Sequence, residues 1–174
     1  MNSEQIAVYL GLGSSMGDRG ANLTRAIEYL SQRLKLVEKS SIYDTMPEGN
    51  EKQPRFLNMV CKVMTHLKPP ELLTLTQGIE RKMGRHPGHM NAPRPMDIDI
   101  LFYGDQVIKE EGLIVPYARL QERAFVLVPL AEIAPGLKHP VLNKSAKQLL
   151  QELGRVHGVV KWQPDKEQEC TGLQ

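Results

Sequence analysis

Residues 92–104 read Ala-Pro-Arg-Pro-Met-Asp-Ile-Asp-Ile-Leu-Phe-Tyr-Gly. A proline-rich start gives way to an apolar run, and this pattern predicts a strand over residues 98–103. Because successive strand side chains point to opposite faces, Asp97 and Asp99 share one face while Ile98 and Ile100 share the other. The isoleucine face can enter a core, and the other face presents two carboxylates side by side.

Two neighbouring carboxylates repel each other unless a cation lies between them. Their oxygen atoms suit Mg²⁺, which takes one or two carboxylates and completes its shell with phosphate oxygens. Arg94, just upstream of Asp97, can hold phosphates in a bidentate contact. The segment therefore favours metal-assisted phosphoryl chemistry, with Asp97 and Asp99 as metal ligands.

The rest of the chain lacks the strict strand–helix alternation of a doubly wound sheet. Its order predicts an α+β sandwich with a mainly antiparallel sheet flanked by helices. One amphipathic helix follows the first strand, and a second begins at two prolines and ends before Gly84. Strands are expected at residues 6–12, 36–43, 56–67, 98–103, 107–108 and 159–162, and helices at 23–34, 69–83, 122–133 and 145–153.

The 174 residues are expected to form one domain over 1–160, followed by a polar tail over 161–174. The net charge of +2 gives no argument for binding to nucleic acid or to a membrane surface. No apolar run is long enough to span a bilayer, and the start of the chain lacks a signal-peptide pattern. Cys61 and Cys170 lie far apart and predict reduced thiols. We expect a cytoplasmic monomer that acts on small molecules.

Three further patterns concern the binding of a phosphate-bearing substrate. Residues 11–15, Gly-Leu-Gly-Ser-Ser, lack the lysine and spacing of a P-loop and favour a tight turn. Gln77 and Glu80 fall on one helix face, which by itself predicts a solvated surface. Arg85 and Arg94 bracket a loop, which favours a cover that neutralises charge during phosphoryl transfer.

Several separated blocks resemble, in the same order, the 6-hydroxymethyl-7,8-dihydropterin pyrophosphokinase family, over residues 5–140. Any one block is unspecific, but the whole series is highly specific. The blocks are Leu10-Gly11-Leu12-Gly13-Ser14; Gly17-Asp18-Arg19 with Asn22-Leu23; Ser40-Ser41-Ile42-Tyr43 with Thr45; Gln53-Pro54 with Phe56-Leu57-Asn58; Gln77-Gly78-Ile79-Glu80; Gly84-Arg85; Pro93-Arg94 with Asp97-Ile98-Asp99-Ile100; and Arg123-Ala124-Phe125-Val126-Leu127 with Pro129-Leu130 and Glu132-Ile133-Ala134-Pro135.

The resemblance implies a ferredoxin-like fold and transfer of a pyrophosphoryl group from ATP to the hydroxymethyl oxygen of the pterin. AMP would be released, two Mg²⁺ ions would assist, and the product would enter folate biosynthesis. The implied catalytic residues are Arg85, Arg94, Asp97 and Asp99, of which Asp97 and Asp99 are the metal ligands. The implied pterin pocket consists of Thr45, Pro47, Phe56, Asn58 and Phe125. The implied ATP contacts are Gln77, Glu80, Arg85, Arg94, Ile98, Tyr117 and Arg123.

The chain departs from the family pattern at Tyr117, where a histidine is common, and at Asn91, where a tryptophan is common. Both changes concern ATP affinity and loop closure rather than the metal pair. Two other functions stay open. One is a catalytically weak module that binds pterin or nucleotide, and the other is a two-metal nucleotidyltransferase, which would release pyrophosphate instead of AMP.

Overall fold

The computed structural model describes residues 4–46, 55–84 and 95–163. The site residues expected at Pro47, Arg85 and Arg94 lie outside these ranges, as do Asn91 and Cys170. Within the ranges, none of the helices combines the length and the hydropathy that crossing a bilayer requires.

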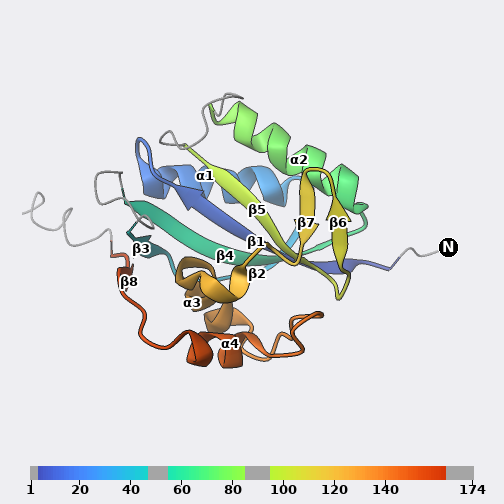
Figure 1. Cartoon of the computed structure of the whole chain (residues 1–174). Helices are drawn as coiled ribbons and strands as arrows, with labels where there is room; N and C mark the ends of the chain where they lie inside the picture. Colours follow the sequence, from blue (N-terminus) through green and yellow to red (C-terminus); the bar gives the residue numbers. More distant parts are fainter. Residues whose placement is uncertain (1–3, 47–54, 85–94, 164–174) are drawn as a thin grey trace, which may run out of the picture.

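An antiparallel sheet runs through the centre of the described chain (Figure 1). Its six strands are β1 (Ile6–Ser14), β2 (Lys35–Lys39), β3 (Tyr43–Thr45), β4 (Phe56–Thr65), β5 (Asp97–Tyr103) and β8 (Val159–Lys161). β1 lies between β5 and β4, and the other edge of β4 pairs with both β2 and β3. β8 extends the sheet beyond β3. A separate hairpin consists of β6 (Ile108–Glu110) and β7 (Leu113–Val115).

Helices cover both faces of this sheet (Figure 1). α1 (Arg19–Ser31) and α2 (Pro69–Lys82) lie on one face, and α3 (Ala124–Ile133) and α4 (Ala146–Leu153) lie on the other. The chain order β1-α1-β2-β4-α2-β5, with β1 and β4 in the middle, is the split βαβ arrangement of ferredoxin-like folds. The expected antiparallel α+β sandwich is therefore confirmed.

The two faces of the sheet carry separate hydrophobic cores. Alternate residues of β1 and β4, such as Leu10 and Leu57, pack under α1 and α2. The opposite alternation places Tyr9 and Val60 under α3 and α4. Both faces of β1 and β4 therefore contribute buried side chains, and β4 is the better buried on its α1/α2 face, since Lys62 and Met64 on the other face are only partly buried.

A register shift between β1 and β5 interrupts the regular alternation of β5 side chains between the two faces of the sheet. Tyr9 pairs with Phe102, whereas its neighbour Leu10 pairs with Ile100, so Leu101 is an extra residue. Leu101 and Phe102 consequently both pack on the α3/α4 side. Ile100 lies before the shift and packs on the α1/α2 side, as alternation predicts.

Several elements differ from the sequence prediction. The strand expected at 36–43 is two strands, because Val60 N donates to Ser40 Oγ at 2.9 Å, where a regular ladder would use a backbone carbonyl. The helix expected from residue 122 begins at Ala124, since Arg123 has an extended backbone (φ −115°, ψ 98°). The short strand expected at 107–108 is β6, and its partner β7 has no counterpart in the prediction.

The ends of α2 and α4 agree with the sequence prediction, whereas α1 (Arg19–Ser31) begins and ends earlier than the helix expected over 23–34. Asp18 caps α1 by accepting a hydrogen bond from Ala21 N at 3.1 Å, and Ser145 caps α4 in a reciprocal capping box with Gln148. Gly84 follows α2 with φ +100°, a conformation that glycine adopts without steric cost. At the other end of the chain, β8 includes Lys161, and the boundary expected at residue 160 stays a prediction.

Candidate active site

Two glycines of β1 leave a hollow in the sheet face that α3 and α4 cover. Gly13 lies between Asn58 of β4 and Asp97 of β5, and Gly11 is paired with Asp99. The side chains of residues paired across antiparallel strands point to the same face. The polar side chains of Asn58, Asp97 and Asp99 therefore lie beside glycines, which carry no side chain. A Cβ atom at Gly13 would lie 2.6 Å from Asn58 Oδ1, which is too close for any other residue without a shift of that amide.

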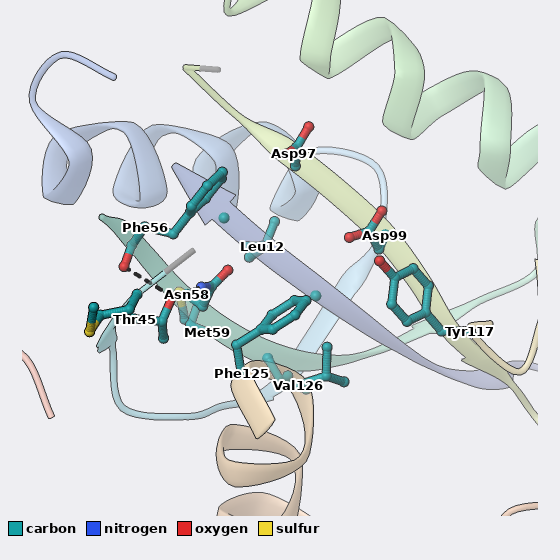
Figure 2. A pocket seen from close by; sticks show the side chains of 14 residues that line it. Leu12, Thr45, Phe56, Asn58, Met59, Asp97, Asp99, Tyr117, Phe125 and Val126 are labelled. Atoms are coloured by element: carbon teal, nitrogen blue, oxygen red, sulfur yellow. Dashed lines mark hydrogen bonds between the residues drawn. The ribbon is translucent and has the colours of Figure 1, made fainter. Parts of the chain in front are cut away.

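This hollow is part of a cavity of about 250 Å³ (Figure 2). β1, β4 and β5 form the floor of the cavity, and the end of β3 and the start of α3 form walls. Tyr117, which follows the β6–β7 hairpin, also lines the cavity. Its lining combines aromatic rings with a few polar groups, which is typical of a small-molecule site. The lining residues are Gly11, Leu12, Gly13, Thr45, Met46, Phe56, Asn58, Met59, Val60, Asp97, Asp99, Tyr117, Phe125 and Val126.

Hydrogen bonds orient the amide at one end of the cavity. Asn58 Nδ2 donates to Thr45 Oγ1 at 2.6 Å, and Thr45 Oγ1 lies 3.4 Å from Phe56 O, to which it donates (Figure 2). Asn58 Oδ1 then lies toward Gly13. The amide can therefore offer an acceptor and its second N–H to a ligand whose edge carries both kinds of group.

Aromatic rings accompany this amide. Phe56 reaches the cavity from β4 and Phe125 from the first turn of α3, and both are partly exposed (Figure 2). Because flat ring faces stack favourably on aromatic groups, these two side chains suit a planar heterocycle. An apolar ring system with a hydrogen-bonding edge fits this end of the cavity.

Two carboxylates and a tyrosine line the other end of the cavity. Asp97 and Asp99 line the same cavity from β5, which confirms that they share a strand face. The Tyr117 hydroxyl points toward Asp99 (Figure 2) and accepts a hydrogen bond from Arg123 Nη1 at 3.1 Å. The Arg123 guanidinium carbon lies 5.1 Å from the centroid of the Tyr117 ring and 6.0 Å from that of Phe125. Stacking and hydrogen bonding thus hold the Arg123 guanidinium against Tyr117 and Phe125, two residues that line the cavity.

Residues 9–135 match the family model described as 7,8-dihydro-6-hydroxymethylpterin-pyrophosphokinase (HPPK). The chain belongs to the HPPK family. A pyrophosphokinase of this name from Aquifex aeolicus is 42% identical over 145 residues, covering 83% of this chain and 91% of the relative. The Bacillus subtilis enzyme of the same name is 47% identical over 142 residues, covering 80% and 85%.

Some HPPK relatives are much longer. The folic acid synthesis protein FOL1 of Dictyostelium discoideum is 36% identical over 161 residues, which cover 91% of this chain and 24% of that protein. The crystal structure of wild-type Plasmodium falciparum HPPK-DHPS with pteroate matches with a TM-score of 0.71 and 16% identity, covering 87% of this chain and 45% of that chain. At this identity the structural match shows a shared fold.

The cavity brings together Thr45, Phe56, Asn58, Phe125, Asp97, Asp99 and Tyr117, all expected at the HPPK site. Four expected ATP contacts within the described residues are not among its lining residues: Gln77, Glu80, Ile98 and Arg123. Glu80 is buried, and its Oε2 accepts a hydrogen bond from Ile98 N at 2.9 Å. Glu80 therefore holds α2 against β5 directly between the two aspartates, and its expected ATP contact stays a prediction.

Sequence reasoning missed part of the lining. The cavity lining includes residues that the sequence did not point to, among them Met46, Val60 and Val126. The sequence pattern predicts a turn at Gly11 and Gly13, but both glycines lie inside β1. Two glycines spaced by one residue share one strand face, and this spacing was the signal for a hollow.

The donor set at the acidic end fits Mg²⁺. Two carboxylates on one strand supply the oxygen ligands that this ion takes from a protein, and phosphate oxygens of a nucleotide can supply others. Among the residues that the structure describes, the acidic end included, no three His, Cys, Asp or Glu side chains gather as a metal-binding group. Cys61 packs on the opposite face of the sheet, and burial raises the pKa of its thiol to about 12, so it is not a nucleophile.

Proposed function

We propose that the cavity binds 6-hydroxymethyl-7,8-dihydropterin at its aromatic end and the ATP triphosphate, with Mg²⁺, at its acidic end. The reaction of the family is transfer of a pyrophosphoryl group from ATP to the hydroxymethyl group of the pterin, which releases AMP and yields the diphosphorylated pterin used in folate biosynthesis. The observation that carries the assignment is the placement of Asn58 and Asp97 on the two sides of Gly13. A ring held by the amide would present its substituent to phosphates held at the carboxylates.

In this arrangement, Phe56 and Phe125 stack on the pterin, while Asn58 and Thr45 read its hydrogen-bonding edge. Asp97 and Asp99 would hold the metal ions, which supply neutralisation of the charge on the pyrophosphoryl oxygens. Arg123, held by Tyr117, adds a guanidinium at the same end. Pro47, Arg85 and Arg94 keep the roles expected from the sequence, as pterin contact and phosphate contacts respectively.

The chemical step is a substitution at the β-phosphorus of ATP. The hydroxymethyl oxygen forms a bond to that phosphorus, the bond to the bridging oxygen of the α-phosphate breaks, and AMP leaves. The hydroxyl proton would pass to water, because the described lining contains no histidine and its two carboxylates, Asp97 and Asp99, are assigned to the metal ions. We expect positioning and charge neutralisation to supply most of the rate enhancement.

The nucleotide product of a single-turnover assay tests this function. Protein, Mg²⁺, ATP and 6-hydroxymethyl-7,8-dihydropterin should give AMP and a diphosphorylated pterin in equal amounts. Release of pyrophosphate would indicate nucleotidyl transfer, and release of ADP would contradict both. Calorimetry that detects a ternary complex with a non-hydrolysable ATP analogue, without turnover of ATP, would identify a binding module. The protein is expected to act as a cytoplasmic monomer on small-molecule substrates.

A further inference from the structure

The C-terminal strand β8 pairs with the strand that carries one wall of the cavity. Val159 pairs with Thr45 at the end of β3, and Met46 N donates to Gly158 O at 2.9 Å. Thr45 and Met46 both line the cavity beside Asn58. β8 itself lies beyond residues 9–135, the part that matches the HPPK family model. A segment outside the family match is thus hydrogen-bonded to the expected pterin pocket.

Gly158 fits closely against Met46. Its φ of +73° is one that other residues rarely adopt, and a Cβ atom there would lie 3.2 Å from Met46 Cβ and Cγ and 3.3 Å from Sδ. The Met46 Cβ atom is attached directly to the backbone that bonds to Gly158, so rotation of its side chain cannot relieve the contact. Any side chain at residue 158 would push on the cavity wall.

Trp162 holds the other end of β8. The backbone N–H of Trp162 donates to Ile42 O at 2.9 Å, and the indole ring packs over Gly20 of α1. A Cβ atom at Gly20 would lie 2.5 Å from the Trp162 ring, so the indole rests almost on the helix backbone. β8 is therefore anchored on the Trp162 side and is joined to the cavity wall through the hydrogen bond between Gly158 and Met46.

We propose that β8 positions the pterin end of the cavity, with Gly158 setting the place of Met46 and Thr45 and Trp162 anchoring the strand. Neither Gly158 nor Trp162 lines the cavity in the described chain, so both act through β3 as positioning residues. The proposal rests on the proposed function, because it assigns this end of the cavity to the pterin. It implies that substitutions at Gly158 and Trp162, which flank β8, weaken pterin binding and leave ATP binding unchanged.

A pair of glycines provides the test. Gly158→Ala forces an alanine into a positive φ and against Met46, whereas Gly154→Ala meets the same backbone strain at φ +80° with no described atom within 4 Å of the new Cβ. Calorimetry measures the Kd of a non-hydrolysable ATP analogue with Mg²⁺, and then the Kd of 6-hydroxymethyl-7,8-dihydropterin in its presence. We expect Gly158→Ala to weaken pterin binding about fivefold and Gly154→Ala to leave it unchanged, with the Kd of the analogue within about twofold in both.

Equal weakening of pterin binding in the two glycine variants, or equal weakening of pterin and analogue binding in Gly158→Ala, overturns the proposal. Trp162→Ala gives a second measurement, because it changes no residue found in the cavity lining: selective loss of pterin affinity supports the proposal, and unchanged pterin affinity overturns it. The wild-type protein separates the two hypotheses. If it releases AMP while Gly158→Ala and Trp162→Ala both bind pterin normally, only the positioning role is refuted. A wild-type protein that binds no pterin refutes the proposed function and this role together.

Discussion

The two faces of β1 differ although they belong to one strand. On the α1/α2 face, Leu10 and Leu12 are almost completely buried and pack tightly. On the α3/α4 face, the same stretch contributes Gly11 and Gly13, and a cavity lies above them. Omitting two side chains from a packed sheet face leaves room that neighbouring polar groups can share with a ligand. One strand therefore stabilises the fold with one face and builds the binding site with the other.

Substitution of the cavity-face carboxylates should have the largest effect. Asp97→Ala and Asp99→Ala should each lower Mg²⁺-dependent AMP release at least about a hundredfold, because charge neutralisation at the transferred group is lost. The thermal midpoint should change little, since both side chains face the cavity rather than a core. Asp105→Ala, at an exposed turn after β5, is the matched control and should keep normal turnover. Near-normal activity in either cavity variant would refute the metal assignment.

Substitution on the packed face should lower stability and spare binding. Leu10 is 0% exposed, so Leu10→Ala should lower the free energy of unfolding by about 2 to 5 kcal/mol through loss of burial and creation of a void. Urea unfolding followed by circular dichroism measures this loss. At temperatures where the variant remains folded, its KM for pterin should equal that of the wild type. A raised KM without a stability loss would break the division between the two faces.

A methyl group on the cavity floor should give a smaller, selective effect. Gly13→Ala places a Cβ atom 2.6 Å from Asn58 Oδ1 and should displace the amide, so we expect the KM for pterin to rise about tenfold with little change for ATP. Gly11→Ala is the matched control, because its Cβ atom would make an ordinary contact at 3.4 Å with Leu101. Equal effects of the two substitutions would show that the Asn58 amide does not decide pterin affinity.

The smallest expected effect is a pH dependence on the α3/α4 side. His139 is buried, its ring packs edge-on against Phe102, and its Nδ1 accepts hydrogen bonds from Val141 N and Leu142 N at 3.2 and 3.1 Å. Burial lowers the pKa of His139 below its ordinary value. The unfolded chain therefore binds this proton at a higher pH than the folded chain does. The stabilising contribution is complete above about pH 6.5 and is lost as the pH falls through the folded pKa.

Thermal midpoints measured between pH 7.5 and pH 5 check this expectation, with the acid-induced decrease smaller in His139→Gln than in the wild type. His157→Gln, at an exposed position, is the control and should follow the wild type. Identical pH profiles for wild type and His139→Gln would mean that the neutral imidazole does not support the fold.

Much of the fold follows from local signals in the sequence. Ser145 and Gly84 mark helix ends because caps act on backbone groups within a few residues, whereas the Asp18 cap was missed and the helix expected from residue 23 begins at Arg19. The shared face of Asp97 and Asp99 follows from strand geometry alone. Features that depend on distant partners were not predictable: Glu80 bonds to Ile98 N across an interface between α2 and β5 that no local pattern encodes.

The sequence by itself determined the fold class, the family and the acidic strand, because periodicity, caps and motif blocks depend on residues close in the chain. Only the tertiary structure decided that Asn58 and Asp97 flank Gly13, that Thr45 orients the Asn58 amide, and that β8 borders the same cavity. These contacts depend on strand register and on pairing between segments far apart in sequence. The physical reason is that register is settled by burial of whole strand faces and not by the residues of any one segment.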